Sequence, residues 1–515
     1  MKRKNTINDI SNSNISELKL SKSLEQNIQM FKNIFVNDDT IRYRNIENKN
    51  QNKLKCCLIY ADGMVNQELV NEDIIKPIIN ADIDYVVSFD KLLDTLLKKE
   101  IISNEIKKTS NIDELIGSVL YGDTIVLIDG IVEALLIDTK GWQTRTINEP
   151  SSERIVKGPR EGFVESIVIN ISLIRRKIRN PNLKFKMRQL GKQTKTDVCY
   201  CYIEGIANEK ILKELERRLD KIDIDGILAS NYIDEMIRDA PYSPFDTVGY
   251  TERPDIVAAK LLEGRFAILV DGTPSVSTLP FIFMEYFQSN EDYYNNYFFS
   301  SFNRLLRYMS FFFTTSILAI YVALVTFHQE MLPTPLILSI TSAREGVPFP
   351  TIVEAFMMVI VFDILREAGV RLPEPIGATV SIVGALILGQ AAVQARFVSA
   401  PIVIIVALTG ISAFLVYPLK GAVIITRLVL LLLSGFLGLY GYIFGVIGLF
   451  IHLMSIRSFG IPYMINLGSI NKQDLKDTAI RAPWWYMYYR PKLMADRNPV
   501  RKADAENNSL TDQNQ

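Results

Sequence analysis

Residues 308–329 read YMSFFFTTSILAIYVALVTFHQ and contain no Lys, Arg, Asp or Glu. About 20 apolar residues are enough for a helix to cross the hydrocarbon core of a bilayer, so this stretch predicts a membrane-spanning helix. Arg304 and Arg307 come immediately before it. Because cations flank membrane spans on their cytoplasmic side, we expect the preceding half of the chain in the cytoplasm.

Further apolar stretches follow at 348–365, 376–395, 397–419 and 428–456. The last is longer than one crossing requires, so we expect either one tilted helix or a helical pair broken near its glycines. Segment 332–343 is too short to span and predicts a re-entrant or interfacial piece. The sequence thus predicts a transmembrane domain at 286–456 with about four to six passes, and the basic tail that follows favours a cytoplasmic C-terminus.

The front half contains an internal repeat. KCCLIYADGMVN at 55–66 aligns with DVCYCYIEGIAN at 197–208, and SVLYGDTIVLIDG at 118–130 aligns with KLLEGRFAILVDG at 260–272, both at an offset of 142 positions. Strand-like runs alternate with helical patterns in each copy, which predicts a small α/β layer. The expected fold class is a multi-span α-helical membrane domain preceded by a duplicated α/β cytoplasmic domain.

The expected domain boundaries follow from the repeat and from composition. Residues 1–22 should form a disordered tail, and 23–53 a helix and linker. The two α/β units should occupy 54–138 and 197–285, with a polar and basic connection at 139–196 between them. Beyond the membrane domain, 457–515 should be a cytoplasmic aromatic and basic tail with a disordered end.

Two Asp-Gly pairs end the apolar runs of the repeat, Asp129-Gly130 and Asp271-Gly272. Active-site aspartates are one interpretation. Structural turns are the favoured one, because glycine supplies a positive φ and aspartate bonds the nearby backbone. Neither copy has a GxGxxG, GxxxxGK[ST] or nucleophile-elbow motif, so we expect no enzyme and no cofactor.

Residue counts argue against several other functions. The chain has 57 Lys+Arg and 57 Asp+Glu, so its charge does not favour a nucleic-acid partner. With 2 His, multi-histidine metal sites are not expected. The four cysteines lie in apolar runs without CxxC spacing. A metal or redox pair of Cys199 and Cys201 is one interpretation, and buried free thiols with no metal are the favoured one.

The stretch RRKIRNPNLKFKMRQLGK at 175–192 is strongly basic. Two interpretations stay open for it. One is a solvated helix and turn, and the other is contact with anionic lipid headgroups at the membrane surface.

Glu354 and Asp363 lie inside the apolar stretch 348–365. Ionisable groups within a membrane span are costly and mark candidate functional sites. At about 100° of rotation per residue, nine positions put the two carboxylates on opposite sides of one helix. One is expected to pair with Arg366 or with an arginine of a neighbouring span while the other meets water; a position near the interface, where the cost is small, is the alternative.

The stretch 376–395 carries a patterned helical face. Its members recur at i, i+4, i+8, i+11 and i+15: Thr379, Val383, Ile387, Gln390 and Gln394. This face is polar at both ends and apolar in the middle. If several copies surrounded an axis, the apolar middle would form a constriction that closes by dewetting, so we treat these residues as candidate pore-lining positions. The alternative is a packing helix whose glutamines bond its neighbours.

Several ordered motifs carry a resemblance to a known family. They are TERPDIVAAKLLEGRFAILVDGTPSVSTLP (251–280), DYYNNYFFSSFNRLLRY (292–308), REGVPFPTIVEA (344–355), LREAGVRLPEPIGATVSIVGALILGQAAV (365–393), RSFGIPY (457–463) and RAPWWYMYYRP (481–491). Together they resemble the A subunits of bacterial spore germinant receptors.

That resemblance implies a multi-pass protein of the spore inner membrane that works with a transmembrane B subunit and a lipoprotein C subunit. It also implies nutrient sensing, and a homo-oligomer that forms a ligand-gated ion channel releasing ions at the start of germination. A secondary transporter component and a non-conducting membrane scaffold are the alternative functions. A transporter would show inverted repeats and broken helices in its membrane half.

Overall fold

The computed structural model describes residues 18–49, 54–81, 106–141, 150, 153–372, 389–465, 477–478, 480–491, 494 and 498–501. The chain divides into two units. The α/β unit comprises Met1–Arg238, Val248–Pro280 and Tyr488–Gln515, and the helical unit comprises Asp239–Thr247 and Phe281–Met487.

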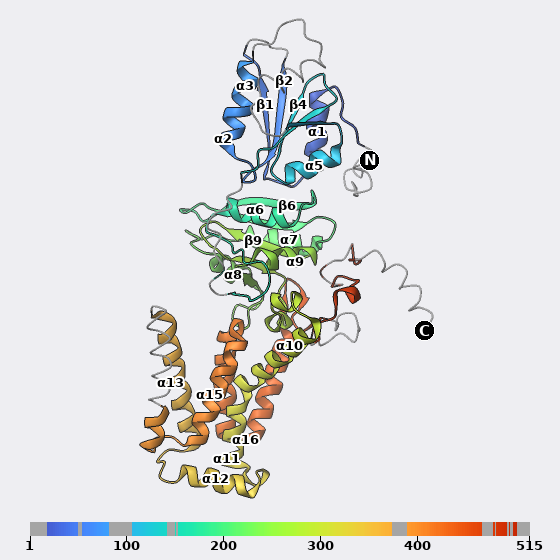
Figure 1. The fold of residues 1–515 in the computed structure, drawn as a ribbon. Coiled ribbons are helices and arrows are strands. Elements are labelled where there is room, and N and C mark those ends of the chain that lie inside the picture. The colour runs from blue at the N-terminus through green and yellow to red at the C-terminus, as the bar shows by residue number, and fades with distance from the viewer. Residues whose placement is uncertain are drawn as a thin grey trace, which may run out of the picture. The chain divides into compact units, whose positions relative to one another are not determined.

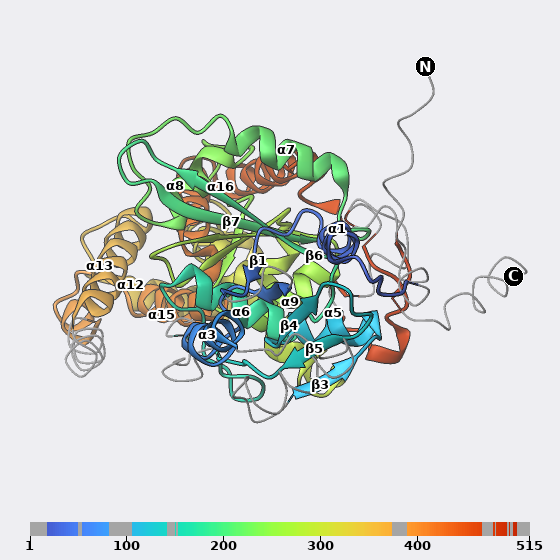
Figure 2. The ribbon, with the colours of Figure 1, turned by 90° about the horizontal axis from the view of Figure 1, so that it is seen from above.

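Two five-stranded antiparallel sheets form the frame of the α/β unit (Figures 1 and 2). The first has the order β1-β2-β4-β5-β3 and the second the order β6-β7-β9-β10-β8. The strands of the first are β1 (Ile41–Glu47), β2 (Lys55–Ala61), β3 (Ile106–Thr109), β4 (Thr124–Ile128) and β5 (Ala134–Ile137). Those of the second are β6 (Leu183–Leu190), β7 (Thr196–Ile203), β8 (Gly249–Thr251), β9 (Phe266–Val270) and β10 (Val276–Leu279).

Helices cover both faces of the first sheet (Figure 1). On one face lie α1 (Leu24–Ile34) and α5 (Ile112–Leu120), and on the other lie α2 (Gln67–Leu69), η2 (Val70–Ile75) and α3 (Lys76–Asn80). In the second half, α6 (Ile167–Lys177) and α9 (Pro254–Leu262) pack on one sheet face, and α7 (Glu209–Leu219) and α8 (Ser230–Ile237) follow β7 in the chain.

The two sheets correspond element by element. The offset of 142 residues relates α5 to α9, β4 to β9 and β5 to β10 at both ends of each element. Strands β1 and β6 hold equivalent edge positions, and α1 and α6 precede them. The repeated unit therefore begins earlier than the boundaries that we expected at 54 and 197. Residues 23–53 hold the expected helix, α1, and also strand β1, and residues 139–196 hold α6 and β6 rather than only a connection.

The two Asp-Gly pairs form turns that cap helices. The Asp129 carboxylate accepts a hydrogen bond from the Leu24 amide at the start of α1, and Asp271 accepts one from Ile167 at the start of α6, both at 3.0 Å. Gly130 and Gly272 have φ of +87° and +82°. An anionic acceptor at a helix N-terminus meets unsatisfied amides and the positive end of the helix dipole.

Residues of the basic stretch join the two sheets. Arg175 is buried and pairs with the buried carboxylate of Asp38 at 2.6 Å. The buried Lys184 donates to the Ile34 carbonyl at 3.3 Å, and the Asp39 amide donates to the Phe185 carbonyl at 2.9 Å. For Arg175 and Lys184 both earlier interpretations are wrong, since neither side chain reaches water or lipid headgroups. Burial also lowers the pKa of Lys184.

All four cysteines are free and buried in the strands of this unit. Cys56 and Cys57 lie in different cores, as alternation along β2 predicts, whereas Cys199 and Cys201 share one. Burial raises the pKa of Cys56 to about 12 and that of Cys57 to about 11. Among the described residues there is no cluster of three or more His, Cys, Asp or Glu suited to a metal ion.

The main helices of the helical unit start with a continuous run of α10 (Tyr297–Phe312), η6 (Phe313–Ile317) and α11 (Leu318–Phe327). They continue with α12 (Thr334–Arg344), α13 (Thr351–Arg371), α15 (Ala400–Leu415) and α16 (Lys420–Ser455). Within the described part of the chain, two helices are long and apolar enough to cross a membrane, Tyr297–Phe327 and Tyr417–Ser455. Helix α15 is apolar but shorter, and α13 contains five charged residues, Glu354, Asp363, Arg366, Glu367 and Arg371.

Helix α16 doubles back at Gly438, which has a φ of +60° and a ψ of −142°. A Cβ on Gly445 would lie 2.6 Å from Leu430, although a straight helix would separate these residues by about 22 Å. Val423 of the first arm and Leu453 of the second also belong to the same core cluster. Of the two forms expected for 428–456, the broken helical pair is the one observed, and Gly438 is needed for its positive φ.

Replacing Arg175 with Met should lower the free energy of unfolding of the α/β unit by about 3–5 kcal/mol, because Asp38 would remain buried without its cation. The measurement is the urea concentration at which the four buried thiols of the full-length protein react with a thiol reagent. Arg42→Met is the matched control: its partner is Asp62, and the Arg42 side chain is 56% exposed, so it should change stability by about 1 kcal/mol at most. Equal shifts in the two variants would contradict a structural role for the buried pair.

Candidate functional site

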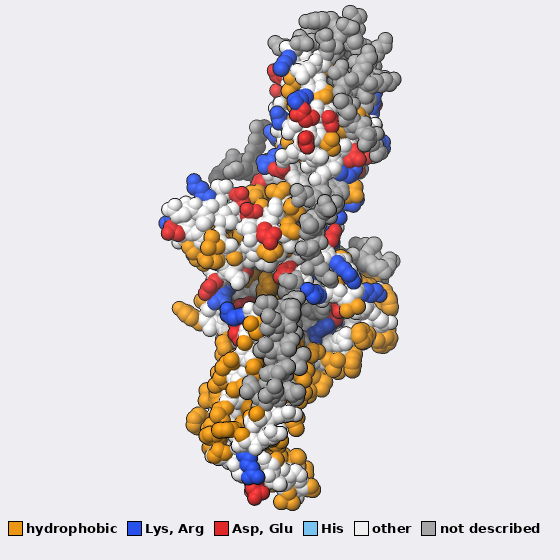
Figure 3. Space-filling view, turned by 60° about the vertical axis from the view of Figure 1, so that its left-hand side comes forward, with side chains coloured by type: hydrophobic (Ala, Val, Ile, Leu, Met, Phe, Trp, Pro, Cys, Tyr) orange, Lys and Arg blue, Asp and Glu red, His pale blue; other side chains and the backbone are white. Residues whose placement is uncertain are grey.

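The helical unit exposes apolar side chains on many sides. Figure 3 shows hydrophobic side chains over much of this part of the molecule. On α16 alone, Phe436 is 73% and Phe444 is 68% exposed. Apolar patches of this extent on a soluble monomer mark interaction or membrane surfaces.

Charged groups lie inside the same unit. Glu354 of α13 is fully buried. Its carboxylate accepts a hydrogen bond of 2.9 Å from the amide of Ser399, which is the N-cap residue of α15, and lies 3.4 Å from the guanidinium of Arg344 at the end of α12. One carboxylate thus ties together three helices, and it stabilises a helix N-terminus that would otherwise carry an unsatisfied amide.

Asp363 lies two and a half turns further along α13 and binds different elements. Its carboxylate pairs with Arg427 of α16 at 2.6 Å and with Arg366 of its own helix at 3.0 Å. The Arg427 side chain is 3% exposed. The two carboxylates do bind different elements, as the helical geometry predicts, but both have cationic partners, so neither is left to water as we expected for one of them.

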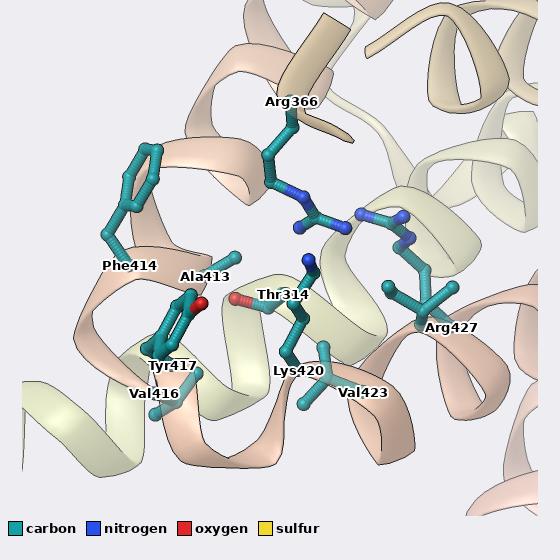
Figure 4. Close-up of a pocket in the computed structure, with 10 residues that line it drawn as sticks. Thr314, Arg366, Ala413, Phe414, Val416, Tyr417, Lys420, Val423 and Arg427 are labelled. Atoms are coloured by element: carbon teal, nitrogen blue, oxygen red, sulfur yellow. The ribbon is translucent and has the colours of Figure 1, made fainter. Parts of the chain in front are cut away.

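A small cavity adjoins Arg366 and Arg427. It has a volume of about 20 Å³, and α13, α15, η6 and the first arm of α16 contribute its walls. Lys420, at the start of α16, also lines it and lies 3.4 Å from Glu367 of α13. Figure 4 shows the side chains of Arg366, Lys420 and Arg427 converging on this space.

A second ionic cluster surrounds the start of α10. Asp292 accepts hydrogen bonds from Arg304 at 2.9 Å and from Arg307 at 2.8 Å, and Arg304 also pairs with Asp477 at 2.7 Å. Asp292 and Arg304 are buried. From the sequence, Arg304 and Arg307 indicate only the orientation of the span that follows. Asp477 lies 173 positions after Arg304, so no local sequence pattern reveals the cluster.

The candidate pore-lining face is described only in part. Thr379, Val383 and Ile387 lie outside the described residues. Gln390 and Gln394 are helical and exposed. The structure therefore brings Glu354, Asp363 and their cations into one helical bundle, while the relation of this bundle to the face of 379–394 stays a prediction.

Glu354→Ala should destabilise the helical unit by about 3 kcal/mol, because Arg344 and the Ser399 amide would lose a buried acceptor. Glu354→Gln should cost about half as much, since its carbonyl can still accept from Ser399. The measurement is detergent-induced unfolding followed by Trp484 and Trp485 fluorescence in a Trp142→Phe background. As a control, Ala at the exposed Glu345 should change little, and an equal loss there would contradict the assignment.

The chain is similar to proteins of one family over most of its length. Residues 29–493 match the family described as Bacillus/Clostridium GerA spore germination protein. Spore germination protein KA of Bacillus subtilis is 43% identical over 94% of this chain and 89% of its own length. The uncharacterized membrane protein YfkQ of Bacillus subtilis is 42% identical over 87% of each chain.

One solved structure is also similar, the crystal structure of the N-terminal domain of the A subunit of the Bacillus megaterium spore germinant receptor GerK3. It is 31% identical, covers 52% of this chain and 98% of that chain, and has a TM-score of 0.41. The resemblance carried by the sequence motifs is confirmed by the family match and the relatives: the chain belongs to the GerA family of spore germination proteins.

Proposed function

We propose that this protein is the A subunit of a nutrient-sensing germinant receptor and that its helical unit lies in the spore inner membrane. The observation that carries the proposal is the inversion of polarity in that unit. Apolar side chains such as Phe414, Phe436 and Phe444 face outward, whereas the charged Glu354 and Arg427 are buried. A lipid environment favours this arrangement. Exposing a charged side chain to hydrocarbon costs free energy, whereas exposing an apolar side chain to it does not.

The helical unit crosses the bilayer several times in this proposal. The run Tyr297–Phe327 provides one crossing. Each arm of α16 has about 17 residues, or about 26 Å of helix, which approaches the ~30 Å thickness of the hydrocarbon core. A hairpin that enters and returns leaves the C-terminal tail on the cytoplasmic side, together with the α/β unit.

Ion conduction is the proposed activity. Several copies surround an axis lined by the face of Thr379, Val383, Ile387, Gln390 and Gln394, with the apolar middle closed by dewetting. The exposure of Gln390 and Gln394 supports a face that other copies or water contact. A transmembrane B subunit and a lipoprotein C subunit complete the receptor, and germinant binding shifts the population toward an open arrangement of the helices.

A secondary transporter is the second candidate. The break at Gly438 favours it, because interrupted helices are typical of transporter cores. The repeat identified in this chain, however, lies in the α/β unit. A non-conducting scaffold is the third candidate, and it predicts neither current nor coupled uptake.

Recording currents from the purified full-length protein in planar bilayers separates the three functions. Val383→Ala should widen the constriction, raise leak current and increase spontaneous germination of spores that carry it. Ile404→Ala removes an aliphatic side chain that is 69% exposed on α15, and it should leave both readouts unchanged. Dormancy and currents equal to wild type in the Val383 variant would contradict a pore at this face.

A further inference from the structure

Three cationic side chains meet at the cavity beside α13 and α16. Arg366, Lys420 and Arg427 line it, and Figure 4 shows their charged ends directed toward one another. Like charges at such close quarters repel, and the repulsion grows where the side chains are shielded from water. Such a cluster therefore requires anions nearby.

Among the described residues of the helical unit, carboxylates balance only part of this charge. Asp363 pairs with both arginines, and Glu367 lies 3.4 Å from Lys420 but is half exposed and also pairs with Arg371. Within the described part of the chain, three cations thus face two carboxylates, one of which also pairs with a fourth cation. The Nε–H groups of Arg366 and Arg427 are buried and have no acceptor among the described residues. A buried donor without an acceptor costs free energy that a bound anion would recover.

The surroundings of the cavity indicate the kind of anion. Its volume of about 20 Å³ holds about one water-sized group, such as a single phosphate oxygen, so the remainder of the ligand must lie outside. The outward-facing part of its lining is apolar: Phe414 is 63% and Tyr417 is 47% exposed, whereas Val416, which also lines the cavity, is buried. A ligand that combines an oxyanion with hydrocarbon fits both features.

We propose that this cavity binds the phosphate of an anionic phospholipid, with its acyl chains along Phe414 and the neighbouring apolar surface of α15. Arg366 and Arg427 donate from their guanidinium groups to the phosphate oxygens, and Lys420 adds a point charge at the mouth. The bound lipid bridges α13, α15 and α16, and so stabilises the bundle that holds Asp363. This inference rests on the proposed membrane location of the helical unit, but not on ion conduction.

Native mass spectrometry of the full-length protein in neutral detergent tests the site. Phosphatidylglycerol and phosphatidylcholine with the same acyl chains are titrated, and inorganic phosphate is tested as a competitor. Lys420→Gln and Arg366→Gln should each weaken binding of phosphatidylglycerol about ten-fold or more, as the loss of a charge-assisted hydrogen bond predicts. The Lys420 side chain is more exposed than that of Arg366, so the test remains valid if the Arg366 variant does not fold.

Arg371→Gln is the matched control. Arg371 lies on α13 and shares the partner Glu367 with Lys420, but its side chain is 78% exposed and does not line the cavity. It should bind phosphatidylglycerol as the wild type does. Equal affinity in all variants, or no preference for phosphatidylglycerol over phosphatidylcholine, would overturn the proposal.

Two other outcomes separate the sources of failure. If inorganic phosphate saturates the site at the affinity of the lipid, the ligand is a free phosphate and the lipid assignment is overturned. Vesicle flotation of the wild-type protein tests the membrane location independently. A protein that floats with vesicles but shows no lipid preference contradicts only this inference, whereas one that does not float contradicts the proposed location as well.

Discussion

The apolar outer surface of the helical unit is the constraint on which the rest of this molecule depends. Side chains such as Phe436 and Phe444 have no cover within the described chain, and water disfavours so large an apolar surface. Hydrocarbon removes this cost but raises that of every charge within the bundle. The pairing of Glu354 with Arg344 and of Asp363 with Arg427 is therefore a condition for the unit to exist in lipid, and it also locks particular helices together.

The α/β unit also uses a buried ion pair, here to join its two sheets. Two copies of one sheet are joined through a buried ion pair, Arg175 with Asp38, supported by one backbone hydrogen bond from the Asp39 amide to the Phe185 carbonyl. A buried pair of this kind adds little net stability over an apolar contact. It does disfavour other alignments of the two sheets, because a buried charge separated from its partner costs free energy. It fixes how the two sheets meet within the duplicated unit.

Much of this architecture follows from the sequence, and the failures have physical causes. The repeat was detectable because β4 and β9 have similar apolar runs, and each is followed by an Asp-Gly turn. The aspartate of this turn caps a helix in both copies. Strands β1 and β6 were missed because they are edge strands with many charged residues, and Lys184 looks solvated when only its neighbours in the chain are considered. Of the two partners of Asp363, Arg366 lies three residues away and could be named from the sequence. Arg427 could be predicted only as an arginine of a neighbouring span, since the 64 positions between it and Asp363 leave no local signal.

Photolabelling from within the bilayer tests the central claim most directly. A lipid-soluble carbene precursor is activated in vesicles that contain the full-length protein, and the labelled residues are identified by mass spectrometry. If the helical unit lies in lipid, label should collect on the exposed Phe414, Phe436 and Phe444 and spare the buried Leu431 and Val406. Label absent from these phenylalanines, together with their modification by a water-soluble carbene, would contradict a membrane location for the unit.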